Sequence, residues 1–283
     1  MQIFETSGWE DYELIDSGNG RRLERFGKYI LSRPDPQAIW LPKLDIKSWE
    51  KAHAIFADKW ILNTDISEKW LLKYKDLSFW AKLTPFKHTG IFPEQILNWE
   101  FISNSLSQSQ FSNLKVLNLF GYTGIASLIA ANAGAKVTHV DASKPAITWL
   151  KENEEASGLT GKIRVISDDV LKFTDREIKR GNKYEGIIMD PPIYGHSPEG
   201  NVWSFNNNFP NLMNNVSKIL SDDSLFVIVN AYALSSSALM LENVMNDYLG
   251  NLGGKIEIGE LALKEKVAGR LLSTGIFARW SKI

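Results

Sequence analysis

The stretch AKVTHVDASKPAITWLKENEEASG, residues 135–158, decides the predicted fold. An apolar run ends at Asp141, and Ser143 stands directly before Lys144, Pro145 and a stretch with helical spacing. Serine is a favoured N-cap, and proline is tolerated in the first turn because its missing N–H has no partner there. The stretch therefore predicts a buried strand, a carboxylate at its end and a capped helix.

The same alternation continues on both sides of this stretch. Strand patterns fall at residues 114–120, 135–141, 161–169, 183–190 and 224–232, with helix patterns between them and near residues 207–220 and 238–248. Strands that alternate with helices indicate right-handed crossovers and a mainly parallel sheet. Two late strands, at 255–262 and 270–280, have no helix between them and should pair antiparallel at one edge. The predicted fold class is α/β, with a Rossmann-like, mostly parallel sheet.

Residues 1–85 have a different pattern. Asn19-Gly20 is a strong hairpin signal, and six tryptophans fall in this stretch, at positions 9, 40, 49, 60, 70 and 80. We expect a small, mostly β domain over 1–85, suited to substrate recognition, and a second domain over 86–283. The alternative is an irregular extension that lies on the main domain.

Composition excludes several classes of site. The 283 residues are 44% hydrophobic and 23% charged with a net charge of −1, so no global basic field indicates nucleic-acid binding. The absence of cysteine excludes disulfides, thiolate metal sites and a thiol nucleophile. The four histidines are far apart, and no apolar run approaches 18 residues, so we expect no metal site, no membrane span and a cytoplasmic protein.

Acidic residues stand at successive strand ends, where ligands bind in open α/β sheets. Asp141, the pair Asp168-Asp169 and Asp190 each follow a strand, and FGYTG at 120–124 follows the first one. Tyr122 occupies the place of the middle glycine in a dinucleotide motif, so the pattern suits a nucleoside without pyrophosphate. Asp141 would accept hydrogen bonds from the ribose and Asp169 from the adenine amino group; the alternative for Asp141 is an Asx-type helix cap.

The segments VLNLFGYTG, HVDAS, DDVLKF and MDPPIYG, in this order, resemble motifs I to IV of the class I S-adenosylmethionine-dependent methyltransferases. They are most similar to a bacterial branch that includes large-subunit rRNA (cytosine/guanine) methyltransferases. KHTGIFPEQ, at 87–95, resembles an upstream element of that branch, and the N-terminal segment resembles a subgroup of uncharacterised members. The resemblance covers about 200 residues, from 87 to the end.

The resemblance implies S-adenosylmethionine as the cofactor and assigns residues to it. The implied cofactor-binding residues are Thr89, Gln95, Asn118, Phe120, Gly121, Tyr122, Thr123, Gly124, Asp141, Ser143, Asp168, Asp169 and Asp190. Those implied at the methyl-transfer centre are Asp190, Pro191, Pro192 and Tyr194. Asn118 replaces the acid usual in motif I of the wider superfamily, and Tyr122 replaces a glycine, but both agree with this branch.

The acceptor is predicted from the DPPIY turn. Consecutive prolines leave carbonyls without competing N–H donors, and Tyr194 offers a stacking face for a base; alternatively, Tyr194 packs inward in a rigid turn. Without a thiol, covalent addition to cytosine carbon 5 is excluded, which leaves a base nitrogen, with guanine the leading candidate. RNA, and rRNA in particular, is the expected partner; a small molecule, a protein side chain or a non-catalytic nucleoside-binding role are the alternatives.

Two further segments are candidates for substrate contact. Residues 195–208 contain Trp203 and Phe205 between glycine and asparagine residues, and form either a mobile lid or a surface loop anchored by these aromatics. Basic side chains that could contact RNA fall in two runs, Arg21, Arg22, Arg25 and Lys28, and Lys264, Lys266 and Arg270. Such runs are also typical of ordinary solvated faces.

Overall fold

The computed structural model describes residues 2–6, 8–196, 202–232 and 237–282. It divides into two compact units. The large unit comprises Met1–Ile3, Leu97–Glu260 and Gly275–Ile283, and the small unit comprises Phe4–Ile96 and Leu261–Thr274. This division lies at Ile96–Leu97 and gives the small unit a second segment near the C-terminus. The domain limits of 1–85 and 86–283 stay a prediction.

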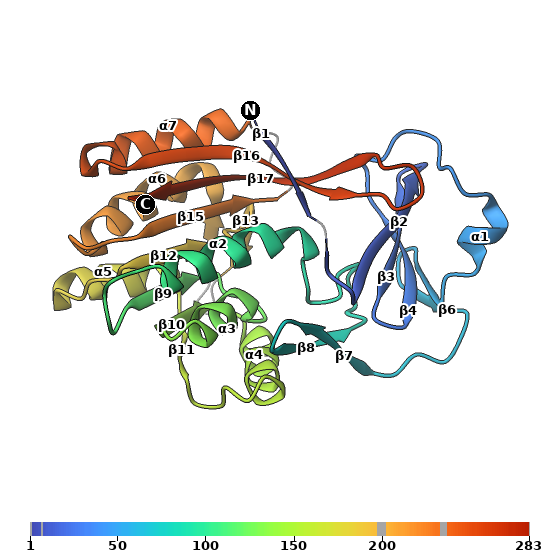
Figure 1. Cartoon of the computed structure of the whole chain (residues 1–283), viewed down its shortest axis with the longest axis horizontal. Helices are drawn as coiled ribbons and strands as arrows, with labels where there is room; N and C mark the ends of the chain where they lie inside the picture. The colour runs from blue at the N-terminus through green and yellow to red at the C-terminus, as the bar shows by residue number, and fades with distance from the viewer. Residues whose placement is uncertain (1, 7, 197–201, 233–236, 283) are drawn as a thin grey trace. The chain divides into compact units, whose positions relative to one another are not determined.

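The main sheet has eight strands in the order β1-β16-β17-β15-β12-β9-β10-β11 (Figure 1). Their bounds are β1 Gln2–Thr6, β9 Lys115–Leu119, β10 Lys136–Asp141, β11 Ile163–Ser167, β12 Gly186–Met189, β15 Phe226–Ala231, β16 Lys255–Lys264 and β17 Leu271–Ser281. Strands β11, β10, β9, β12 and β15 pair parallel, and β17 pairs antiparallel with β15. The predicted α/β fold with a mostly parallel sheet is confirmed, whereas the edge strand β1 was not predicted.

Helices cover both faces of the sheet (Figure 1). They are α2 Ile96–Ser107, α3 Ile125–Asn132, α4 Lys144–Ala156, α5 Val170–Arg180, α6 Phe205–Ile219 and α7 Ala238–Leu249, with a 3-10 turn, η2, at Gly250–Leu252. Val227 and Val229 of β15 join the core beneath α5, α6 and α7. Phe226, on the opposite face, makes a ring contact with Phe101 of α2. Alternate β15 side chains therefore enter two different layers.

Local sequence explains where the helices near the sheet edge begin and end. Ser143 caps α4 and accepts a hydrogen bond from Ala146 N, as predicted. Asp169 caps α5 in the same way, and Gly181 ends that helix in the left-handed region, where a side chain would be strained. The two caps lie at the edge of the sheet where β10 and β11 end.

The small unit is β-rich, as expected. Its strands are β2 Tyr12–Gly18, β3 Arg21–Phe26, β4 Tyr29–Pro34, β5 Ala54–Phe56, β6 Trp60–Leu62, β7 Lys69–Tyr74 and β8 Leu77–Lys82, with α1 at Ile46–Glu50 and a 3-10 turn, η1, at Pro93–Gln95. Strands β2 to β6 form one sheet, and β7 and β8 form a separate hairpin. Asn19 and Gly20 both have positive φ between β2 and β3, which is the geometry of the predicted tight turn.

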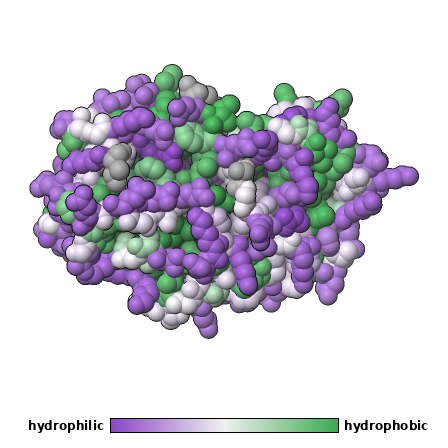
Figure 2. Space-filling model, in the orientation of Figure 1, coloured by the Kyte–Doolittle hydropathy of each residue, from purple (hydrophilic) through white to green (hydrophobic). Residues whose placement is uncertain are grey.

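The exterior seen in Figure 2 is mostly hydrophilic, with hydrophobic residues in several separate areas. Within the described ranges, no helix has both the length and the apolar character that crossing a bilayer requires.

Candidate active site

The strand register brings the predicted segments to one edge of the main sheet. Leu119 of β9 lies beside Val140 of β10 and Met189 of β12, and Asp141 lies beside Ser167 of β11. The residues that follow, Phe120, Asp168 and Asp190, therefore leave the sheet at the same level as Asp141. Because β10 and β12 flank β9 on opposite sides, strand order reverses here, and ligands bind at such reversals in open α/β sheets.

The loop after β9 has an unusual backbone. Phe120 has φ 55°, Tyr122 has φ 50° and Gly124 has φ 83°, so every second residue is left-handed. Positive φ is costly for bulky side chains and is concentrated at functional sites. A Cβ on Gly121 would overlap the His139 ring, and one on Gly124 would overlap Leu150. The two glycines are therefore required by packing, and at Gly124 by backbone conformation as well.

Asp141 connects this loop to the next helix. Its Oδ2 accepts a hydrogen bond from Tyr122 N at 2.8 Å, and its Oδ1 accepts one from Ser143 N at 2.7 Å. The contact with Ser143 is the Asx-type interaction considered as the alternative, but the bond to Tyr122 gives the carboxylate a second role. Burial raises the pKa of Asp141, while the two backbone N–H groups lower it. The carboxylate is thus fixed in position at the strand end with lone pairs left for other donors.

The acidic pair after β11 is partly used within the protein. Asp168 forms an ion pair with Arg176 and accepts a hydrogen bond from Asp169 N at 2.8 Å. Asp169 accepts from Leu171 N at 3.0 Å and Lys172 N at 3.1 Å, both through Oδ1. Neither cap bond uses Oδ2 of Asp169; the adenine contact of Asp169 stays a prediction.

The turn after β12 differs from the prediction in one respect. The Pro192 carbonyl, expected to be open to the site, accepts a hydrogen bond from Trp203 Nε1 at 2.6 Å. Asp190 is half-buried, and burial raises the pKa of its carboxyl to about 6. Tyr194 is 58% exposed, which excludes the inward-packed alternative. Pro191 is buried and Pro192 is exposed.

The described part of residues 195–208 lies in two short paired strands and the start of a helix. Strand β13, Tyr194–His196, pairs antiparallel with β14, Val202–Ser204, and α6 begins at Phe205, two residues before the predicted start. Trp203 is 7% exposed and Phe205 is 2% exposed. In its described part, the segment is therefore anchored by its aromatics; residues 197–201 lie outside the described residues.

Two other predicted cofactor residues of the large unit point into the protein. Asn118 is buried and donates to Ser127 Oγ at 2.9 Å, and Ser127 Oγ lies 3.0 Å from His139 Nδ1. Thr123 is buried, and its carbonyl accepts from Asn153 Nδ2 at 2.9 Å. The side chains of Ser127 and Asn153 therefore hold the end of β9 and the loop that follows it.

His139 was interpreted from the sequence as a packed core residue, and the structure confirms this. It is fully buried, and burial lowers the pKa of its imidazole to about 3. The supporting partners Ser127 and Asn153 were not predicted. Their only sequence signal is a polar residue on the buried side of an otherwise apolar helix.

Thr89 and Gln95 belong to the small unit. Thr89 is buried, with its carbonyl accepting a hydrogen bond from Lys82 N at 3.2 Å, and Gln95 ends the 3-10 turn η1. Their role at the cofactor stays a prediction.

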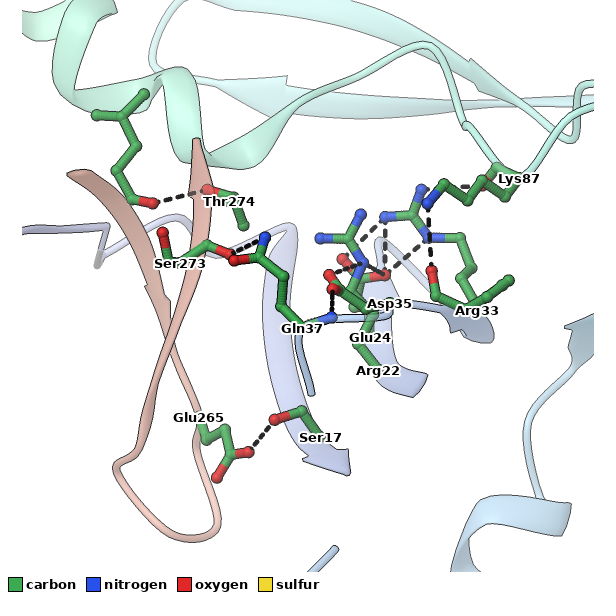
Figure 3. Close-up of polar contacts among 12 residues, drawn as sticks. Ser17, Arg22, Glu24, Arg33, Asp35, Gln37, Lys87, Glu265, Ser273 and Thr274 are labelled. Carbon is green, nitrogen blue, oxygen red and sulfur yellow. Dashed lines mark hydrogen bonds and ion pairs between the residues drawn. The ribbon is translucent and has the colours of Figure 1, made fainter. Parts of the chain in front are cut away.

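The residues of the first basic run differ in exposure: Lys28 is exposed, whereas Arg22 is buried. Arg22 is 5% exposed, with its Nε 3.3 Å from Glu24 Oε2 and 3.8 Å from Asp35 Oδ2, and Glu24 also pairs with Arg33 at 2.7 Å. Figure 3 shows Glu24 held between the two guanidinium groups. An Arg22 that is buried in this network is not available to RNA, so the prediction is wrong for this residue.

The second basic run is also paired with carboxylates, but the side chains of Lys264 and Lys266 are 49% and 64% exposed. Arg270 binds Glu265 at 2.7 Å and Asp16 at 3.2 Å, and Lys264 and Lys266 pair with Glu5 and Glu13. In the first run, Arg21 donates to Ser32 and to the Phe56 carbonyl, and Arg25 to the carbonyls of Gly27 and Glu10. These side chains stabilise the small unit. In the part of the chain that the structure covers, no group of three or more His, Asp or Glu is arranged to hold a metal ion.

Comparison with known proteins identifies the family. The model of the family described as Conserved hypothetical protein 95 matches residues 99–231. The crystal structure of the SAM-dependent methyltransferase from Agrobacterium tumefaciens matches with a TM-score of 0.97 and 41% identity, over 100% of this chain and 94% of that one. Another structure, described as a methyltransferase complexed with SAH, has a TM-score of 0.74 over 97% of this chain and 76% of that one; its 18% identity indicates the fold alone.

Curated relatives match over a shorter stretch. Ribosomal RNA large subunit methyltransferase K/L from Shewanella frigidimarina is 32% identical over 168 residues, which are 58% of this chain and 22% of that protein. For the homologous methyltransferase K from Neisseria meningitidis the shares are 54% and 42%, so this chain spans less than half the length of either relative. With 41% identity over nearly the full length of both chains in the Agrobacterium comparison, the chain belongs to the S-adenosylmethionine-dependent methyltransferases.

Proposed function

We propose that the protein transfers the methyl group of S-adenosylmethionine to a nitrogen atom of an RNA base, with ribosomal RNA as the acceptor in the cytoplasm. One observation carries the proposal. The anchored carboxylate of Asp141 and the Asp190-Pro191-Pro192 turn leave the sheet at the same level, on either side of the strained loop after β9. A nucleoside site and a methyl-acceptor site at this edge are therefore neighbours.

The donor set fits the cofactor. Asp141 would bind the ribose hydroxyls, Asp169 would accept from the adenine amino group through Oδ2, and the loop from Phe120 to Gly124 would pass along the methionine portion. When bound, S-adenosylmethionine supplies an electrophilic methyl group on a cationic sulfur. Carboxylates at the strand ends favour such a cation, whereas they would repel a pyrophosphate.

Asp190 and Tyr194 would handle the acceptor. A carboxyl with a pKa of about 6 is mostly ionised at pH 7, so Asp190 can accept the proton that a base nitrogen loses when its N–CH3 bond forms. The exposed ring of Tyr194 can stack on a flat base next to this carboxylate. Holding nitrogen, methyl and sulfur in line is the main contribution of the protein, and orientation can lower the barrier by roughly 7–11 kcal/mol.

The choice of acceptor rests on two supports. The curated relatives are named as ribosomal RNA methyltransferases. The chain has no cysteine, so thiol-dependent addition to carbon 5 of cytosine is impossible. Methylation of a base nitrogen does not require a thiol. We assign acceptor recognition to the small unit.

Labelled methyl transfer tests the proposal. Ribosomal RNA, protein and metabolite pools from a strain that lacks the gene are incubated with the protein and S-adenosylmethionine carrying a tritiated methyl group. We expect label in ribosomal RNA, weaker cofactor binding in Asp141→Ala, and lost turnover with retained binding in Asp190→Ala. Label in the protein or metabolite pool alone would refute the RNA acceptor, and normal cofactor binding by Asp141→Ala would refute the site.

A further inference from the structure

Trp203 touches both halves of the proposed site. Its indole Nε1–H donates to the Pro192 carbonyl at 2.6 Å. Pro192 belongs to the turn of residues 190–194, called here the acceptor turn. The Trp203 ring centroid lies 4.8 Å from that of Phe120, at an interplanar angle of 61°. Phe120 begins the loop of residues 120–124, called here the cofactor loop. The Trp203 side chain is 7% exposed, and its hydrogen bond to Pro192 is partly buried.

Each contact fixes a segment that local structure leaves weakly determined. Phe120 holds a left-handed backbone conformation at φ 55°, which a bulky residue keeps only when its surroundings impose it. Pro191 and Pro192 have no N–H groups, so neither residue can donate a backbone hydrogen bond that would help to fix the turn. The Pro192 carbonyl is held by the indole, and the next carbonyl, of Ile193, accepts from Phe205 N at 2.9 Å.

We infer that Trp203 is a positioning residue that keeps the cofactor loop and the acceptor turn in register for methyl transfer. The inference rests on the proposed function. In-line displacement is sensitive to alignment, and a misplacement of 1 Å can cost on the order of 100-fold in rate. Trp203 does not touch the reacting atoms in this proposal; it acts through Phe120 and Pro192.

The chain offers a matched control. Trp280 is also buried, and its Nε1 donates to a backbone carbonyl, that of Gly253, at 2.7 Å. Trp203→Phe and Trp280→Phe therefore lose the same kind of hydrogen bond at two places in the large unit. A merely structural role predicts the same result for both variants.

The kinetic test uses tritiated-methyl S-adenosylmethionine and ribosomal RNA from the deletion strain. We expect Trp203→Phe to lower kcat by about 10- to 100-fold, with the Kd for S-adenosylmethionine changed less than about twofold, because the substitution loosens the alignment of the two segments but removes no group that would bind the cofactor. Trp280→Phe should keep the kcat of the unmodified protein. Equal kcat values for the two variants would overturn the inference. An unmodified protein that binds no S-adenosylmethionine would overturn the proposed function instead.

Amide hydrogen exchange tests the inference without any substrate. Trp203→Phe should speed exchange both at residues 120–124 and at residues 193–196, while Trp280→Phe should leave both at the rate of the unmodified protein. Phe120→Leu removes the ring contact with Trp203 but keeps the hydrogen bond from the indole to Pro192. This variant should also speed exchange at 193–196. Faster exchange confined to the segment nearest each substitution would overturn the inference, even if methyl transfer were never detected.

Discussion

Replacing Asp190 with asparagine should stabilise the protein in a pH-dependent way. The folded protein raises the pKa of this carboxyl from 3.8 to about 6 because burial disfavours the charged form. A difference of about 2 units corresponds to roughly 3 kcal/mol, and partial exposure to water reduces this to about 1–2 kcal/mol. Asparagine carries no charge at any pH, so the variant avoids this cost.

The sign follows from proton binding. Well below the unfolded pKa of 3.8 the carboxyl is protonated in both the folded and the unfolded chain, so Asp190→Asn should have little effect on stability there. Between about pH 4 and pH 6 the unfolded chain ionises at this carboxyl while the folded chain keeps its proton, so the unmodified protein loses stability and the advantage of the variant grows. Above the folded pKa both states are ionised, and the advantage stays at its full value up to about pH 8. In a thermal melt this corresponds to an increase in Tm of about 2–8 °C.

Melting curves of both proteins between pH 4 and pH 8, with methyl-transfer rates at pH 8, measure the effect. Asp223→Asn, at an exposed carboxyl, controls for the loss of one negative charge. The variant should be more stable at pH 8 and about 100-fold or more slower in turnover. A difference in Tm that stays constant across the pH range, or a less stable variant at pH 8, would refute the account of Asp190 as a desolvated acid.

Three further substitutions test other contacts. Asp141→Ala should weaken S-adenosylmethionine binding by at least about 100-fold in calorimetry, because charged hydrogen bonds contribute about 1.5–3 kcal/mol each; a Kd within threefold would contradict this role. Gly124→Ala should lower the free energy of unfolding by about 3 kcal/mol, since its Cβ would overlap Leu150, whereas Gly134→Ala, also at positive φ but facing open space, should cost about 1 kcal/mol. Equal losses in denaturant titrations would contradict the overlap. Glu24→Gln should cost about 3 kcal/mol because it leaves two buried arginines without their shared carboxylate, and a neutral effect would contradict that network.

Much of the large unit is predictable from sequence because its signals are local. The run to Asp141, the cap at Ser143 and the glycine turn after β9 each occupy a few consecutive residues, and parallel pairing then brings the strand ends together. The acids of the candidate site could be named for the same reason. Their partners within the protein could not, because Arg176 and Tyr122 reach Asp168 and Asp141 only after the helix and loop have formed.

The remaining errors concern contacts between residues distant in sequence. Arg22 and Arg270 fall in charged runs typical of surfaces, yet Arg22 is buried beside Asp35 and Arg270 is bound by Asp16, and local patterns do not connect these carboxylates to them. The hydrogen bond from Trp203 to Pro192 closes a hairpin whose pairing has no alternating signal. The edge strand β1 was missed for a related reason, since its partner β16 lies at the other end of the chain.

The discontinuity of the small unit has a consequence for biosynthesis. Asp16 and Ser17, near the start of the chain, bind Arg270 and Glu265, near its end. While a ribosome is still translating the middle of the message, the emerging N-terminal segment lacks these ligands, and the buried Asp16 carboxylate has no arginine beside it. Completion of the small unit is thereby deferred until residues Leu261–Thr274 have been synthesised, although most of the unit is translated first.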